Sequence, residues 1–158
     1  MKGTDFDELA YFRAITEAGA RALLIGRRAL VVLGLPVMTA DYDFWLHIDD
    51  IEVFNRLSDP FDLLPTFPPD QARRRGRYAL ENDEHVDVLI SRSMPTVGGP
   101  TVAFDEMWAR RQAVPLNDTT FVALPSVPDL ILTKRFAARP KDLEDIRLIE
   151  ITFKDQLP

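Results

Sequence analysis

The fold of this protein is decided by residues 24–43, which read LIGRRALVVLGLPVMTADYD. The apolar run before Gly26 predicts a short buried strand, and the residues after this glycine suit a helix. A second strand is predicted from Tyr42 to Ile48, where aromatic and aliphatic residues are concentrated. Asp41 and Asp43 stand at its start. Because side chains two positions apart on a strand share a face, these carboxylates should converge on one spot.

A third carboxylate interrupts another apolar strand. Asp87 lies between valines within residues 84–91, and residues 77–81 form the preceding strand of a predicted hairpin. If residues 84–91 and 42–48 are neighbours, Asp87 joins the first two aspartates. Three clustered carboxylates repel one another unless cations hold them, and their hard oxygen ligands suit Mg²⁺ or Mn²⁺. Two ions could be shared among them.

The remaining pattern predicts one mixed α+β domain, with a small mixed or antiparallel sheet flanked by helices. We expect a single unit over residues 1–158, with a core at 21–91 and a helical C-terminal part at 126–155. Further helices are predicted at 5–18, 29–33, 51–57, 104–110, 126–138 and 143–151, and a further hairpin at 113–116 and 120–124. Residues 59–76 hold four prolines and little periodicity, so they are predicted to form a loop.

Composition narrows the chemistry. The chain of 158 residues has no cysteine and two histidines far apart in sequence, which excludes thiolate chemistry and disfavours histidine-rich metal sites and Ser-His-Asp triads. Catalysis would therefore rest on carboxylates. Neither a signal peptide nor a membrane-length apolar run is visible, so we expect a cytoplasmic protein without membrane contact. A net charge of −6 disfavours nonspecific nucleic-acid binding over the whole surface.

A family resemblance is carried by residues 24–29 and 34–43. They resemble the signature of the DNA polymerase β-like nucleotidyltransferase superfamily, in which a Gly-Gly or Gly-Ser turn leads through a helix to an Asp-x-Asp/Glu pair. Asp87 matches the third carboxylate of that family. Residues 129–134 and 139–145 are similar to the C-terminal helical motif of bacterial AbiEii-like members, which include toxins. The resemblance spans roughly residues 21–150.

The resemblance implies a nucleotidyltransferase fold, two Mg²⁺ (or Mn²⁺) ions and a nucleoside triphosphate. It assigns catalysis and metal binding to Asp41, Asp43 and Asp87. The implied nucleotide-binding residues are Gly26, Arg27, Thr39 and Lys134. The implied reaction is an in-line displacement at the α-phosphate, which leaves a nucleoside monophosphate on a hydroxyl of an RNA end, a small molecule or a protein.

Two positions depart from the family pattern and keep other functions open. Arg27 stands where the family has its second Gly or Ser, and Val37 where many relatives carry an arginine. The Arg27 side chain either binds phosphate or blocks the pocket. The alternative to an enzyme is an inactive nucleotidyltransferase-fold binding module, which would act as a nucleotide sensor or as half of a toxin–antitoxin pair. A homodimer and a purely structural subunit also remain as hypotheses.

Several charged residues have a plainer interpretation beside the functional one. Lys134 is interpreted first as a solvated residue of an amphipathic helix and second as a triphosphate ligand. Charged residues near the C-terminus are interpreted as ordinary pairs one turn apart on a helix, namely Arg139, Lys141, Asp142 and Asp145. The basic residues at 73–77 form either a solvated loop or a contact to RNA or nucleotide phosphate.

Overall fold

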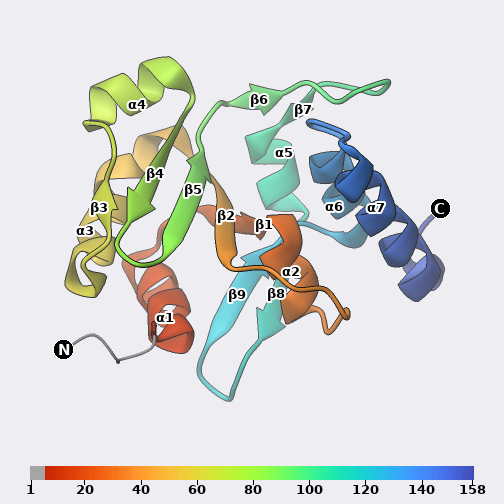
Figure 1. Ribbon diagram of the computed structural model, residues 1–158, viewed down its shortest axis with the longest axis horizontal. Helices are drawn as coiled ribbons and strands as arrows, with labels where there is room; N and C mark the ends of the chain where they lie inside the picture. Colours follow the sequence, from red (N-terminus) through yellow and green to blue (C-terminus); the bar gives the residue numbers. More distant parts are fainter. Residues whose placement is uncertain (1–5) are drawn as a thin grey trace.

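The computed structural model describes residues 6–158 and has the mixed α+β order expected from the sequence (Figure 1). The helices and strands are α1 Glu8–Ala18, β1 Ala22–Ile25, α2 Gly26–Val32, β2 Asp41–Leu46, α3 Ile51–Ser58, β3 Leu64–Pro65, α4 Pro69–Arg75, β4 Arg77–Glu81, β5 His85–Leu89, β6 Ser93–Met94, β7 Val102–Ala103, α5 Phe104–Ala109, β8 Gln112–Pro115, β9 Phe121–Leu124, α6 Val127–Lys134 and α7 Pro140–Thr152. Short 3₁₀ helices occupy Ile48–Asp50, Asp59–Phe61 and Lys154–Gln156.

The main sheet has five strands in the order β1-β2-β5-β4-β3. Strands β2 and β5 run parallel, whereas the other neighbouring pairs of this sheet are antiparallel. A parallel pair needs a crossover connection, which here contains α3, β3, α4 and β4. Two further hairpins, β6–β7 and β8–β9, stand beside the sheet. The predicted mixed sheet flanked by helices is confirmed.

One face of the sheet is filled by aromatic side chains from the helices that cover it. Phe44 on β2 meets Phe12 of α1 and Phe54 of α3 edge to face, with ring centroids 6.4 and 5.4 Å apart. Val86 and Val88 of β5 are buried in the same cluster. Such packing fixes the register of β2, because a slip of one residue would turn every side chain to the opposite face.

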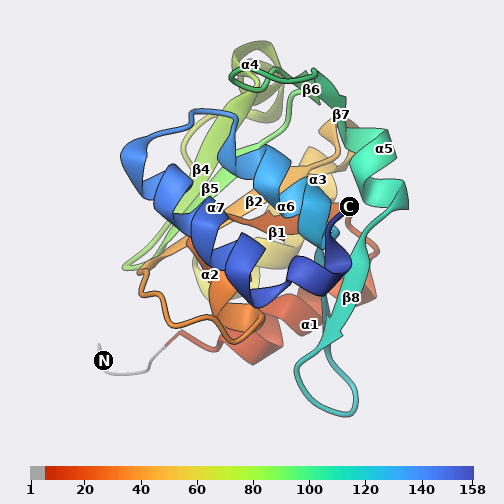
Figure 2. The same cartoon turned by 90° about the vertical axis from the view of Figure 1, so that its right-hand side faces the viewer.

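The opposite face of the sheet is covered over only part of its length. Trp45 is fully buried there and meets Phe104 of α5 and Phe136, which follows α6, with ring centroids 5.4 Å away in both cases. By strand alternation, Asp43 and Asp41 lie on this same face beyond Trp45. Figure 2 shows α6 and α7 on this side of the sheet. The apolar cover ends at the tryptophan, so the strand ends that carry the aspartates are left facing a cavity.

The prediction of a loop over residues 59–76 is wrong, because this segment contains β3 and α4. Prolines break helices in their interiors, but at the first helical position the missing N–H is not needed, and Pro69 occupies that place. Ala72 is buried, three arginines occupy the last turn, and Gly76 ends the helix with a φ of 78°. Basic side chains at a helix C-terminus interact favourably with its dipole.

Other boundaries also differ from the predicted ones, among them the end of the second strand, which is at Leu46 rather than at Ile48. Helix α2 starts at Gly26 rather than at residue 29, and α6 ends at Lys134 rather than near 138. Helix α7 starts at Pro140 rather than at 143, because the carboxylate of Asp142 accepts a hydrogen bond from the backbone N–H of Arg139 at 3.0 Å and so closes the first turn. The predicted start of the first helix, Asp5, lies outside the described residues. Among residues 6–158, no helix has both the length and the apolar character required to span a bilayer.

Candidate active site

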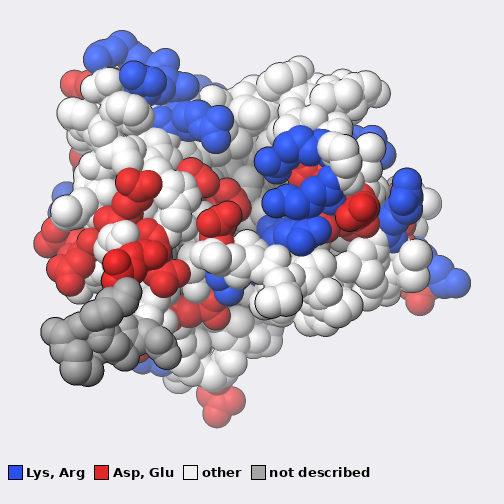
Figure 3. All heavy atoms as spheres, in the orientation of Figure 1, with Lys and Arg blue, Asp and Glu red and all other residues white. Residues whose placement is uncertain are grey.

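A cavity of about 380 Å³ opens where the apolar cover of the sheet ends. Its walls come from the β1–α2 turn, from β2, β4 and β5, and from the end of α6 through the start of α7. Figure 3 shows acidic side chains gathered on one side of the central hollow and basic ones on the other. The cavity therefore lies between an acidic wall and a basic wall.

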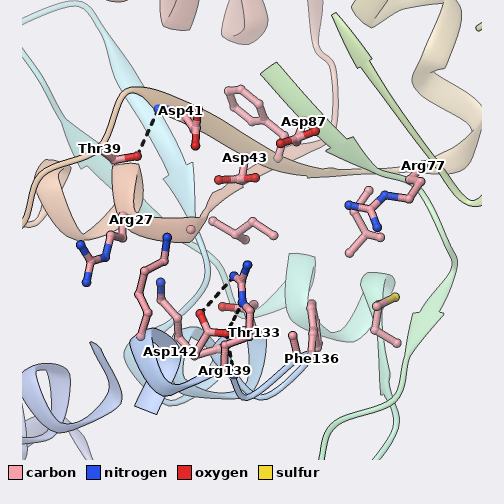
Figure 4. Close-up of a pocket in the computed structure, with 18 of the residues that line it drawn as sticks. Arg27, Thr39, Asp41, Asp43, Arg77, Asp87, Thr133, Phe136, Arg139 and Asp142 are labelled. Carbon is pink, nitrogen blue, oxygen red and sulfur yellow. Dashed lines mark hydrogen bonds and ion pairs between the residues drawn. The ribbon is translucent and has the colours of Figure 1, made fainter. Parts of the chain in front are cut away.

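The acidic wall consists of Asp41, Asp43 and Asp87, all of which line the cavity (Figure 4). In the parallel register of β2 and β5, Asp43 stands directly opposite Asp87. Burial raises the pKa of Asp43 to about 6, and the nearby charges of Asp87 and Asp41 contribute to that rise. The carboxylates thus repel one another in a partly desolvated place, which favours a cation between them.

A histidine holds Asp87 in its present orientation. His85 contacts Asp87 Oδ1 through Nε2 at 3.0 Å and Glu81 Oε2 through Nδ1 at 2.8 Å. Burial alone lowers the pKa of His85, but the two carboxylates outweigh it and raise the pKa above its usual value. With the side chains in these positions, no group of three or more Asp, Glu or His residues within 6–158 is arranged to hold a metal ion.

Gly26 closes the floor of the cavity beside Asp43. Its φ is +70°, a conformation that L side chains rarely adopt. A Cβ atom at this position would lie 2.5 Å from Asp43 Oδ2 and 3.0 Å from Asp43 Cβ. Glycine is therefore required here both by the backbone and by the neighbouring carboxylate. Thr39 also lines the cavity, and its Oγ1 accepts a hydrogen bond from the backbone N–H of Asp41 at 3.1 Å.

The basic wall contains two of the predicted nucleotide-binding residues. Arg27 donates to both carboxylate oxygens of Asp145, at 3.1 and 3.0 Å, and Lys134 Nζ donates to Asp145 Oδ2 at 2.9 Å. The interpretation of Lys134 as a solvated residue is wrong, because only 5 % of its side chain is exposed. The interpretation of Asp145 as a partner within its own helix is also wrong, because its partners lie on α2 and α6.

Three further cations at the cavity were not predicted as site residues. They are Arg77 on β4, Arg139 before α7 and Lys141 in its first turn. Arg139 pairs with Asp142 along the chain, as predicted, at 2.9 Å. Within residues 6–158, Arg77 and Lys141 have no ion-pair partner. For Arg77 the sequence signal was the basic run at 73–77, whose second interpretation was a contact to RNA or nucleotide phosphate, whereas nothing in the sequence indicated that Arg139 and Lys141 line the cavity.

The other departure from the family pattern has a structural explanation. Val37 packs against the hydrophobic core and does not line the cavity. The loop that carries it is held by Arg28, whose Nη2 donates to Thr39 O at 3.2 Å and whose guanidinium lies 4.1 Å from the centroid of the Tyr42 ring. A valine at this position therefore supports the loop and contributes nothing to the basic wall.

Comparison with known proteins rests on structure, because the sequence matches no family model and no curated protein. The antibiotic-resistance factor ANT(2'')-Ia superposes with a TM-score of 0.64 over 93 % of this chain and 83 % of its own, at 14 % identity. A putative nucleotidyltransferase from Thermotoga maritima gives a TM-score of 0.60 over 87 % of this chain and 86 % of its own, at 12 % identity. The chain has the nucleotidyltransferase fold. At these identities the likeness extends to the fold alone, because one fold can carry different chemistries.

Proposed function

We propose that this protein is a metal-dependent nucleotidyltransferase, which moves a nucleoside monophosphate from a nucleoside triphosphate to a hydroxyl acceptor. The observation that carries the proposal is the meeting of Asp41, Asp43 and Asp87 in one cavity of a nucleotidyltransferase fold, opposite a wall of cations. The carboxylates suit the metal ions that accompany a triphosphate, and the basic groups opposite suit its negatively charged phosphates.

The acidic wall fits divalent ions by the chemistry of its donors. Three carboxylates offer hard oxygen ligands, and the pKa of Asp43 is raised first by burial and then by the charges of Asp87 and Asp41, which Lys134 and His85 do not offset. Asp41 and Asp43 would hold two Mg²⁺ or Mn²⁺ ions between them, and Asp87 would complete one site. When bound, such ions polarise the α-phosphate and make the acceptor hydroxyl more acidic.

The remaining steps belong to the protein's own groups. Asp87 accepts the proton of the acceptor hydroxyl at Oδ2, because its Oδ1 is already bonded to His85. The hydroxyl oxygen then bonds to the α-phosphorus, and the bond from that phosphorus to pyrophosphate breaks. Arg27 and Lys134 neutralise the charge of the triphosphate and of the departing pyrophosphate. Gly26 and Thr39 shape the floor on which the nucleotide phosphates lie.

The test is label transfer by the purified protein. The protein with Mg²⁺ and each α-labelled triphosphate in turn should label a component of cell RNA or lysate, and EDTA should stop it. Asp43→Asn should reduce labelling by at least about a hundredfold. The control is Asp118→Asn, which makes the same charge change at an exposed position of the β8–β9 turn and should label like the parent. Equal labelling by both variants, or none by the parent, would refute the proposal.

For the acceptor, the arginines beside the cavity favour RNA. Arg74 and Arg75 end α4 with exposed side chains, and Arg77 continues from them into the cavity. Figure 3 shows the basic side chains over α4 in the view that also shows the central hollow. Basic groups in such a row bind successive phosphates and make binding salt-dependent. An RNA acceptor agrees with the AbiEii-like resemblance, and a toxin role would follow if the labelled RNA lost its cellular function.

A non-catalytic nucleotide-binding module is the second candidate. It is favoured by the contact between His85 and Asp87, which occupies one of the carboxylate oxygens that a metal ion would use. Calorimetry separates the two functions. A sensor, or one half of a toxin–antitoxin pair, would bind triphosphate or its partner tightly without Mg²⁺ and without turnover, whereas the enzyme would need the ion for both.

A further inference from the structure

The basic wall of the cavity depends on a charge that lies behind it. Asp145 is 2 % exposed and does not line the cavity, whereas its two partners, Arg27 and Lys134, do. The three residues come from three helices, with Arg27 on α2, Lys134 on α6 and Asp145 on α7. The carboxylate therefore stands on the protein side of the two cations, and the cavity lies on their other side.

Two cations cannot be held side by side in a buried place without an anion. Lys134 is 5 % exposed and the Arg27 side chain 25 %, so water screens neither charge well. Burial alone raises the pKa of Asp145, but the hydrogen bonds from Arg27 and Lys134 outweigh it and lower the pKa. Asp145 is thus ionised and offsets one of the two positive charges. The trio keeps one net positive charge, which faces the aspartates across the cavity.

The same contacts settle where the Arg27 side chain goes. A long side chain directly after Gly26 would fill the space for phosphate if it projected into the cavity. The paired hydrogen bonds from its Nε and Nη2 to Asp145 instead hold the guanidinium against α7. Arg27 therefore remains at the wall of the cavity, beside Lys134.

We propose that Asp145 is the positioning residue of the nucleotide site: it holds Arg27 and Lys134 side by side as a single phosphate-binding unit and keeps Arg27 from obstructing the cavity. This inference rests on the proposed function, because it assigns the trio to triphosphate binding. It also makes the docking of α7 a condition for nucleotide affinity, because no other residue joins α7 to both cations within residues 6–158.

The experiment compares Asp145→Asn with a matched control, Asp129→Asn. Asp129 is a 3 % exposed aspartate in a two-bond pair with Arg110, at 2.9 and 3.1 Å, and neither residue lines the cavity. Both variants break an Arg–Asp pair whose carboxylate is buried, so both should lower the melting temperature. Binding of ATP, GTP, CTP and UTP is measured by calorimetry with Mg²⁺ on each folded variant. In a second measurement, each variant without nucleotide is treated with an acetylating reagent, and mass spectrometry gives the rate at which Lys134 is acetylated. This rate reports how strongly the ion pair protects the lysine.

Asp145→Asn should weaken the preferred triphosphate by about tenfold or more, while Asp129→Asn stays within about twofold of the parent. Acetylation of Lys134 should accelerate only in Asp145→Asn, and Asp145→Glu should restore part of both properties. In label transfer, Asp145→Asn should raise KM more than it lowers kcat. Equal affinities for Asp145→Asn and Asp129→Asn would overturn the inference and leave the proposed function standing. A parent that binds no triphosphate would overturn both.

Discussion

Replacing Asp43 by asparagine is expected to stabilise the metal-free protein at neutral pH while abolishing nucleotidyl transfer. The pKa of Asp43 is raised from 3.8 to about 6, first by burial and then by the charges of Asp87 and Asp41. An acid whose pKa is raised by folding binds its proton more tightly in the folded state. The free energy of unfolding therefore falls as pH rises from about 4 to about 6, and the loss persists at pH 7.

The size of this loss follows from the pKa values. The interval between 3.8 and about 6 corresponds to at most about 3 kcal/mol. Asparagine has a similar shape and no charge, so Asp43→Asn should recover most of that energy at pH 7 and little of it at pH 4. For a chain of this length, the expected increase in melting temperature at pH 7 is about 6–12 °C.

The assay is thermal and urea denaturation in EDTA at pH 4, 5, 6 and 7, with Asp118→Asn as the control for charge alone. Adding Mg²⁺ should then stabilise the parent more than Asp43→Asn, because only the parent keeps the full set of ligands. The reasoning is refuted if Asp43→Asn is no more stable than the parent at pH 7, or if its advantage is as large at pH 4 as at pH 7.

Three further changes test separate features. In urea denaturation, Gly26→Ala should lower the free energy of unfolding by about 3 kcal/mol, because it adds a clash with the Asp43 carboxylate to the backbone strain. Gly34→Ala should cost only about 1 kcal/mol, because Gly34 has a φ of +87° but open space around it. Equal costs would contradict the clash. Ala138→Gly should add up to about 1 kcal/mol in the same assay, because Ala138 has a φ of 51°, and a destabilised variant would show that this turn is not strained. Changing Arg74 and Arg77 to glutamine should weaken RNA binding, measured by filter binding from 50 to 200 mM salt. The slope of log K against log salt concentration should become shallower by about 1 for each phosphate that the protein no longer neutralises. An unchanged slope would show that these arginines do not contact RNA.

The sequence predicted the parts of this structure that depend on short-range patterns. Asp41 and Asp43 flank a single residue on a strand, so their shared face follows from the two-residue period. Asp87 lies between two buried valines and so faces away from them, but its place beside the other two aspartates depends on the pairing of β2 with β5, which the sequence analysis had to assume. Gly26 was equally visible, because a glycine between a strand and a helix commonly marks a close approach of the backbone. These residues could be named without knowing the rest of the fold.

The parts that the sequence did not predict depend on tertiary contacts. Asp145 pairs with Lys134, eleven positions earlier on another helix, and with Arg27, which lies near the other end of the chain. Helix periodicity instead indicated partners one turn away on the same helix, and these were wrong. The loop prediction for residues 59–76 was wrong because adjacent prolines are typical of loops. The helix that Pro69 starts is stabilised by the burial of Ala72, which is a tertiary contact. Both errors share a cause, since local patterns do not reveal which elements pack together.

The parallel pairing of β2 and β5 has a consequence for how such a protein can change. Asp43 and Asp87 are neighbours through two adjoining strands, so their spacing does not depend on the length of the chain that connects those strands. That chain leaves β2 after Leu46 and carries α3, β3 and α4 before β4 begins at Arg77. Its exposed turns can gain, lose or exchange residues without displacing either carboxylate, provided that Phe54 of α3 still packs on Phe44. The exposed arginines at the end of α4 belong to this stretch, so under the proposed function the surface that meets the acceptor can change while the three carboxylates keep their places.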